Sequence, residues 1–170
     1  MTLKTARFVN LLLAALLVGN DFGTWAAVHR SLWNMSTPEH IRAEQTLTRR
    51  FKSITPFWMS SVAVSCLPVL ALTHNRAPFA FRSTLTAMFC FIGMMVSTLL
   101  GNMPINTRTL ELSPEETPPE EWKQLRKRWE RLHALRVLLN VAGDPAAAGS
   151  TERRGTAMNV PSKPCRKERA

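Results

Sequence analysis

The sequence predicts an all-α membrane protein, a four-helix bundle with a short or truncated fourth helix and a disordered C-terminal tail. Three long segments of the 170-residue chain are almost free of charge: residues 8–28 carry only Asp21, and residues 54–73 and 87–103 carry none. Basic, polar segments separate them. Because about 20 apolar residues cross the ~30 Å hydrocarbon core of a bilayer, this alternation is typical of a multi-pass helical membrane protein.

The charge distribution indicates which partners to expect. The net charge of +10 lies outside the apolar segments, so we interpret it as juxtamembrane charge next to a lipid bilayer. Nothing interleaves aromatic residues with a basic groove as in a single-strand binder, and we expect no nucleic-acid partner. The three cysteines, Cys66, Cys90 and Cys165, lack ligand spacing, so we assign no disulfide and no metal site.

The first predicted span covers residues 6–28. Basic residues followed by a leucine-rich run resemble the start of a signal peptide, but the apolar character continues past Trp25 without a small-residue cleavage site. We therefore expect an uncleaved anchor. Gly19 and Gly23 form a G-x-x-x-G pattern, which permits close helix approach.

The second predicted span covers residues 54–73. A polar connection with amphipathic helical character precedes it at 30–53, with Thr37 as the helix cap and Pro38 in the first helical position. The span contains Pro56 and Pro68, which a membrane helix tolerates where neighbouring helices satisfy the freed carbonyls.

The third predicted span, residues 79–103, follows a short turn and should pack antiparallel to the second. Gly93, Ser97 and Gly101 recur at every fourth position, a small-residue seam suited to tight helix packing. We expect this helix to end or kink at Pro104.

The fourth predicted span, residues 127–143, is anomalous. It follows an acidic loop at 112–121, and its helix should restart near Pro119 or Glu120. From Leu132 to Gly143 there are only about 12 residues, too few for the roughly 20 that a span needs. We therefore assign residues 1–143 to the bundle and residues 144–170 to a disordered basic tail, which is poor in hydrophobic residues.

The fourth span carries a line of functional side chains. At about 100° per residue, Trp129, His133, Arg136 and Asn140 fall on one narrow helical stripe, and leucines cover the other faces. In a membrane protein such a stripe must face other protein or a cavity, because ionisable groups in hydrocarbon are costly. We therefore expect the functional chemistry of the protein on this stripe.

The elements P-I-N-T-R and R-W-E-R-L-H-A-L-R resemble those of the anthrone oxygenase family, which are small integral-membrane proteins. The family's P-x-N element follows its third span, and its W-x-x-x-H-x-x-R element opens the fourth. The likeness covers residues 6–143. It departs at the end, because the family's fourth helix continues as apolar sequence where this chain reads D-P-A-A-A-G-S-T-E-R-R.

The resemblance implies oxidation of an anthrone-type aromatic polyketide to an anthraquinone with O2, without metal or flavin. An anthrone methylene is acidic, and its anion reduces O2 directly. The chemistry then needs a base, donors for the oxyanion and a flat apolar pocket. We assign His133 as the base, Asn106 as an oxyanion donor and Arg136 as the stabilising cation. Trp129, Asn102 and Asp21 are the expected substrate-binding residues.

Each assignment has a structural alternative. Trp129 is equally well explained as an interfacial residue, His133 as a hydrogen-bonding partner of another helix, and Asn106 as a cap after Pro104. An unpaired Asp21 would be costly in hydrocarbon, so we predict a contact from Asp21 to Arg136 or His133.

Other groups give weaker signals. His29 and His133 could together seat a metal such as non-haem iron, but their order along the chain gives no ligand spacing. His40 and His74 should face water or headgroups, and the run K-Q-L-R-K-R at 123–128 should be a solvated helix start.

Three functional hypotheses remain. The first is the oxygenase, an integral multi-pass protein that takes an aromatic small molecule and O2. The second is a non-catalytic membrane bundle or small-molecule-binding protein, and the third is a degenerate copy with an incomplete fourth helix. A ligand-sized cavity along the polar stripe would favour the first over an inert bundle. The cationic residues of the connections favour placing the first and third connections in the cytoplasm.

Overall fold

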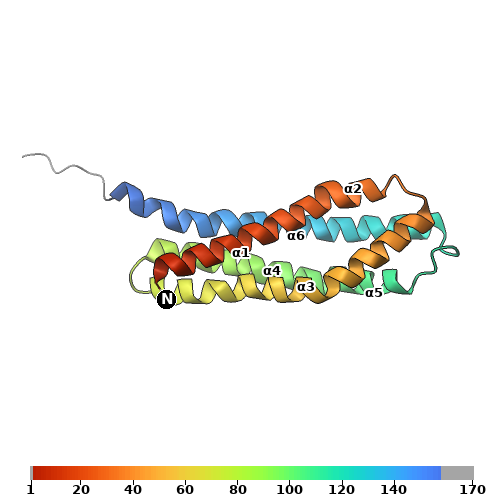
Figure 1. Cartoon of the computed structure of the whole chain (residues 1–170). Helices are drawn as coiled ribbons and strands as arrows, with labels where there is room; N and C mark the ends of the chain where they lie inside the picture. The colour runs from red at the N-terminus through yellow and green to blue at the C-terminus, as the bar shows by residue number, and fades with distance from the viewer. Residues whose placement is uncertain (1, 158–170) are drawn as a thin grey trace, which may run out of the picture.

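The computed structural model describes residues 2–157, with side chains through residue 144. Four long helical rods lie side by side in an elongated bundle (Figure 1). Each rod contacts the next around a ring, first to second, second to third, third to fourth and fourth to first. This is the four-helix bundle that the sequence predicts, and the described residues contain no strand.

The first rod is longer than its predicted span. It consists of α1 (Leu3–Gly23), a π-helical turn η1 (Thr24–Val28) and α2 (His29–Leu32). Thr2 caps its start by accepting a hydrogen bond from the Thr5 amide at 3.2 Å. The G-x-x-x-G pattern does not mark a close contact, because a Cβ at Gly19 or Gly23 would meet nothing within 4 Å.

The second rod is one continuous helix, α3 (Thr37–Thr73), so the expected polar connection at 30–53 is mostly the first half of this helix. Its cap is Ser36, one residue before the predicted Thr37, and the Ser36 amide donates to the Glu39 carboxylate at 3.0 Å. The helix continues through Pro56 and Pro68, as predicted.

The third rod comprises α4 (Pro78–Ser97), a second π-helical turn η2 (Thr98–Asn102) and α5 (Met103–Glu111). The expected end at Pro104 is wrong, because Pro104 lies in the first turn of α5, where its missing amide hydrogen is of little consequence. The predicted small-residue seam does pack against the fourth rod: a Cβ at Gly101 would lie 2.9 Å from Leu132.

The fourth rod is α6 (Pro119–Ala157), which starts where the sequence predicts and continues past Gly143. The predicted fourth span ends at residue 143, whereas the helix extends to Ala157. Residues 158–170 lie outside the described part of the chain. By length and composition, the first three rods are apolar enough to cross a membrane.

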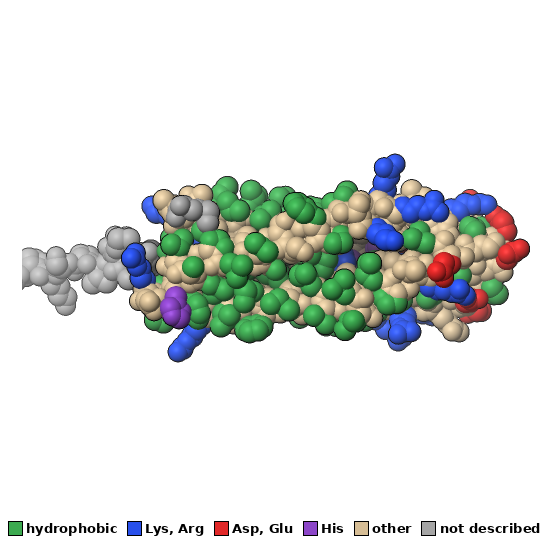
Figure 2. Space-filling model, turned by 90° about the horizontal axis from the view of Figure 1, so that it is seen from below, with side chains coloured by type: hydrophobic (Ala, Val, Ile, Leu, Met, Phe, Trp, Pro, Cys, Tyr) green, Lys and Arg blue, Asp and Glu red, His purple; other side chains and the backbone are tan. Residues whose placement is uncertain are grey.

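The bundle has two chemically different halves. Green hydrophobic side chains dominate one part of the surface in Figure 2, whereas acidic and many basic side chains gather at the end that holds α2, α5 and the start of α6. A core of buried apolar residues fills the first part: Ala14, Leu17, Met59, Val62, Cys66, Ala87, Phe91 and Met94. The candidate site lies between these two halves.

Candidate functional site

A cavity of about 290 Å³ opens between the four rods. This volume is close to the lower limit of roughly 300 Å³ for small-molecule pockets. Its wall mixes apolar side chains with hydroxyl, amide, imidazole and guanidinium groups. Side chains from every rod contribute, among them Asn20, Thr24, His29, Glu44, Thr48, Phe51, Lys52, Met59, Met95, Thr98, Leu99, Met103, Asn106, Trp129, His133 and Arg136.

Both π-helical turns border the cavity. Thr24 opens η1 and Thr98 opens η2, and both side chains line the wall. A π turn accommodates one additional residue in a helix and is frequently found at functional sites. Here the turns occur on the first and third rods, and His29 follows η1 directly.

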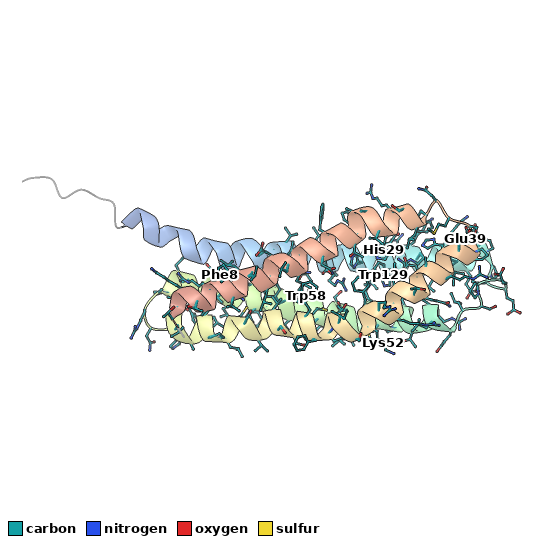
Figure 3. The ribbon with its side chains drawn as sticks, in the orientation of Figure 1. Phe8, His29, Glu39, Lys52, Trp58 and Trp129 are labelled. Carbon is teal, nitrogen blue, oxygen red and sulfur yellow. The ribbon has the colours of Figure 1, made fainter. Side chains whose placement is uncertain are left out.

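An aromatic cluster forms the α6 side of the cavity. The rings of Trp129 and His133 are stacked, with centroids 4.6 Å apart and planes inclined by 16°. The His29 ring lies 4.5 Å from Trp129, and Figure 3 shows these two residues side by side inside the bundle. The Arg126 guanidinium lies 4.3 Å from the Trp129 centroid. Trp129 therefore packs mainly against protein groups and presents no free ring face to a ligand.

His133 is fully buried yet makes no hydrogen bond among the described residues. Both of its ring nitrogens are inaccessible and without a partner. The backbone of Asp21, on the first rod, is nevertheless close enough to influence the His133 ring. A buried polar group without a partner costs about 1–3 kcal/mol of free energy and is rare in folded proteins.

Asn106 presents its amide group to the cavity in a fixed orientation. The Trp129 indole Nε1 donates to Asn106 Oδ1 at 2.7 Å, so the Asn106 NH2 group remains available as a donor. Asn102 differs from its predicted role. It is buried and donates to the backbone carbonyl of Trp129 at 3.3 Å, and it is absent from the cavity wall. It holds α6 against η2.

The predicted contact of Asp21 is present. Arg136 donates to Asp21 Oδ1 at 2.7 Å, and Asn140 donates to Oδ2 at 2.5 Å. Asp21 is 1% exposed and lies outside the cavity wall, whereas Arg136 lines it. Asp21 thus neutralises and orients Arg136 from behind, which makes it a positioning residue of the site.

A second charged cluster, which the sequence analysis missed, adjoins the cavity. Glu44 accepts from His29 Nδ1 at 2.8 Å and from Arg126 at 2.7 Å, with His40 Nε2 3.7 Å away. All four side chains are buried. The opposite charges of Glu44 and Arg126 offset the desolvation that burial imposes on each.

Two expectations about solvent exposure are wrong for this cluster. His40 does not face water or headgroups, because it is 2% exposed and packs edge-on against Trp33 and Trp122. Arg126 belongs to the supposedly solvated run at 123–128 but is also 2% exposed. His74 is exposed, as predicted.

A sequence signal for these residues existed. The 3–4 spacing of Trp129, His133, Arg136 and Asn140 extends backwards to Trp122 and Arg126. One helical face of α6 therefore carries the whole polar and aromatic lining. Stopping the stripe at Trp129 left Arg126 in the group of surface charges.

Comparison with known proteins assigns the chain to a family. The family model described as anthrone oxygenase matches residues 45–144, which is more than half of the chain. The chain belongs to the anthrone oxygenase family. No curated protein and no solved structure matches it.

The anthrone oxygenase match includes the two motifs from which the sequence analysis inferred the resemblance. Asn102, Asn106, Trp129, His133 and Arg136 all fall within residues 45–144. Asp21, His29 and Glu44 precede the matched range, although the fold brings them to the same site. Among the described residues, no group of three His, Cys, Asp or Glu side chains is arranged to hold a metal ion.

Proposed function

We propose that this anthrone oxygenase family member is a multi-pass membrane enzyme that oxidises an anthrone-type aromatic compound to an anthraquinone with O2. One observation carries the proposal. A ligand-sized cavity inside an apolar bundle brings Asn106, His133 and Arg136 to the same wall. An inert packing bundle would not need such a cavity along its polar stripe.

The reaction balances without a further reductant. Anthrone, C14H10O, and O2 give anthraquinone, C14H8O2, and one molecule of water. A base removes one methylene proton, and the resulting anion transfers electrons to O2 and forms a carbon–oxygen bond. The peroxide oxygen takes up a proton. Loss of the second proton from the same carbon then breaks the oxygen–oxygen bond and releases water as the carbonyl forms.

The residues of the cavity suit these steps. We assign the proton acceptor to His133, whose neutral imidazole has no competing hydrogen bond. Asn106 donates its free NH2 group to the oxyanion of the substrate. Arg136 places a positive charge, held in position by Asp21, beside the same anion. The apolar part of the wall accommodates the flat rings.

The division of the surface into an apolar and a charged half indicates how the protein lies in the membrane. We propose that all four rods lie across or within the bilayer, with the apolar half in hydrocarbon and the charged half at the headgroups. The helix segments next to that end carry cationic residues, among them Arg42 and Lys52 of α3, whereas the connections 33–36 and 112–118 carry none. On the positive-inside rule, we propose that this end lies in the cytoplasm. The cavity then lies near the interface, where an amphipathic aromatic compound would concentrate.

The experiment that tests the function compares purified wild type with His133→Ala in detergent. Anthraquinone absorbance and O2 consumption are recorded with an anthrone panel, and protein-free samples measure spontaneous oxidation. We expect turnover above background in wild type and a loss of about 100-fold or more for His133→Ala, in the range of general-base contributions. His74→Ala, which removes an exposed imidazole, is the matched control. Equal rates for wild type and the protein-free sample would refute the function.

A second candidate is a small-molecule-binding protein without turnover. The observation that favours it is the inaccessibility of both His133 ring nitrogens, since a base must reach its proton. In that case the protein would bind the anthrones of the panel, measured by tryptophan fluorescence, without consuming O2.

A further inference from the structure

The reaction proposed above removes two protons from one carbon, and the cavity contains a second imidazole besides His133. His29 lies directly after η1 and lines the cavity wall. Its ring centroid is 5.7 Å from that of His133. It precedes the part of the chain that matches the anthrone oxygenase family, so the family match assigns it no role.

Glu44 determines which nitrogen of His29 carries the proton. Glu44 Oε1 lies 2.8 Å from His29 Nδ1, and two lone pairs at that distance would repel each other. The neutral ring is therefore protonated at Nδ1 and donates to Glu44, which leaves the lone pair on Nε2. Arg126 also lies 3.1 Å from Nδ1, but its stronger contact is with Glu44, at 2.7 Å.

The Nε2 atom of His29 is accessible, unlike the ring nitrogens of His133. It has no hydrogen-bond partner among the described residues, and it keeps some accessible surface. A carboxylate on one side of an imidazole and an open lone pair on the other is the arrangement that makes histidine an effective general base.

The charges around the two imidazoles also differ. His29 faces the Glu44 carboxylate from α3 and faces Arg126 and His133 from α6, and Glu44 itself contacts His40. Glu44 places a carboxylate against the His29 ring. His133 instead has Arg136 on its own helix and His29 across the cavity, and no carboxylate bonds to its ring.

We propose that His29, oriented by Glu44, is a second catalytic base of this cavity and accepts a substrate proton at Nε2. The proposal rests on the proposed function. One carbon–hydrogen bond of the methylene breaks and a nitrogen–hydrogen bond forms at Nε2, while the electron pair stays on the substrate. The proton then returns to the peroxide oxygen or to the departing hydroxide, which restores neutral His29.

The test uses His29→Gln and Glu44→Gln in the full-length protein in detergent, with two partial reactions measured separately. Anaerobic exchange of the anthrone methylene protons with deuterated water reports the first abstraction. Aerobic anthraquinone formation reports both. We expect His29→Gln to slow at least one of them by about 100-fold. Slowed exchange means that His29 takes the first proton, and normal exchange with slow anthraquinone formation means that it takes the second.

Glu44→Gln should have a smaller effect and a distinct signature. Without the carboxylate, the His29 Nδ1–H group loses its charged acceptor, so the ring is no longer held in one tautomer, and its nitrogen-15 chemical shifts should show a mixture of the two neutral tautomers. Glu115→Gln is the matched control, because it removes an exposed carboxylate that does not line the cavity. Melting temperature and binding of anthraquinone establish that each variant is folded.

The outcomes separate the two proposals. If wild type oxidises anthrones and His29→Gln matches it in both partial reactions, the role of His29 is wrong and the function stands. If wild type is inactive, both proposals fail. Nitrogen-15 chemical shifts of His29 provide a readout that does not depend on turnover. An unprotonated Nδ1 in the resting protein would contradict the proposed tautomer.

Discussion

The two halves of the bundle are held together by different forces. In the apolar half, small and aliphatic side chains such as Ala14, Val62 and Phe91 pack into a core, and large apolar side chains such as Phe57 remain exposed on the outside. In the charged half, Glu44 and Arg126 are buried together. The apolar half is therefore apolar both inside and outside, whereas the charged half has charged groups in its interior and on its surface.

This difference shows how the site is stabilised. In lipid, apolar side chains gain nothing by moving inside, so the apolar half depends on close packing. The charged half resembles a soluble protein whose interior contains ions, and each buried ion needs its partner. The cavity lies where the two meet, so its apolar wall comes from one half and its ionisable groups from the other.

The largest expected effect comes from breaking the buried ion pair. Arg126→Met leaves Glu44 buried without its cationic partner, and we expect a loss of about 3–5 kcal/mol of stability. Thermal unfolding in detergent, followed by circular dichroism, measures it. Arg42→Met is the matched control because it removes an exposed arginine that pairs with Glu115, and should change stability by less than about 1 kcal/mol. Equal melting temperatures for both variants would contradict the comparison.

An intermediate effect is expected from Asp21→Asn, which keeps the shape of the side chain but removes its charge. Arg136 would lose its ionic partner, at a cost of roughly 1.5–3 kcal/mol for a charge-assisted hydrogen bond. We expect anthrone turnover to fall by about 10-fold, because a mispositioned guanidinium stabilises the substrate anion less well. Unchanged turnover and melting temperature would show that Asp21 does not position Arg136.

The smallest effect on stability is expected in the apolar half, where close packing alone holds the helices together. A Cβ at Gly143 would lie 3.0 Å from the Phe91 ring, whereas one at Gly19 would meet nothing within 4 Å. Gly143→Ala should therefore destabilise the bundle by about 1 kcal/mol, and Gly19→Ala should stabilise it by about 0.5–1 kcal/mol. The same unfolding measurement compares them, and a reversed order would mean that α6 is not tightly packed against α4 at this point.

Hydropathy and helical spacing were sufficient to predict the four-helix bundle, the start of α6 and the contact between Asp21 and Arg136. They work because apolar length and a lone buried charge each leave few physical solutions. Helix continuity was harder to predict. Pro104 suggested a break, but a proline in the first turn of a helix costs little, and a π turn is not visible in hydropathy.

The partnership of His29 with Glu44 could not be predicted for a different reason. The two residues belong to different helices, 15 positions apart, and their pairing depends on how far the first rod rotates through η1. Spacing within one helix identifies a stripe such as Trp129, His133 and Arg136. It carries no information about which residue of another helix meets that stripe.

The two π-helical turns make the site sensitive to the number of residues as well as to their identity. Each turn contains one residue more than an α-helix of the same length would hold. Deleting one residue from Thr24–Val28 would restore an α-helical turn and keep His29 near its present angle around the helix axis. Deleting one residue of α1, such as the exposed Leu16, would instead rotate the whole following segment by about 100° and turn His29 away from Glu44. The loss of one codon thus has opposite consequences inside and outside a π turn.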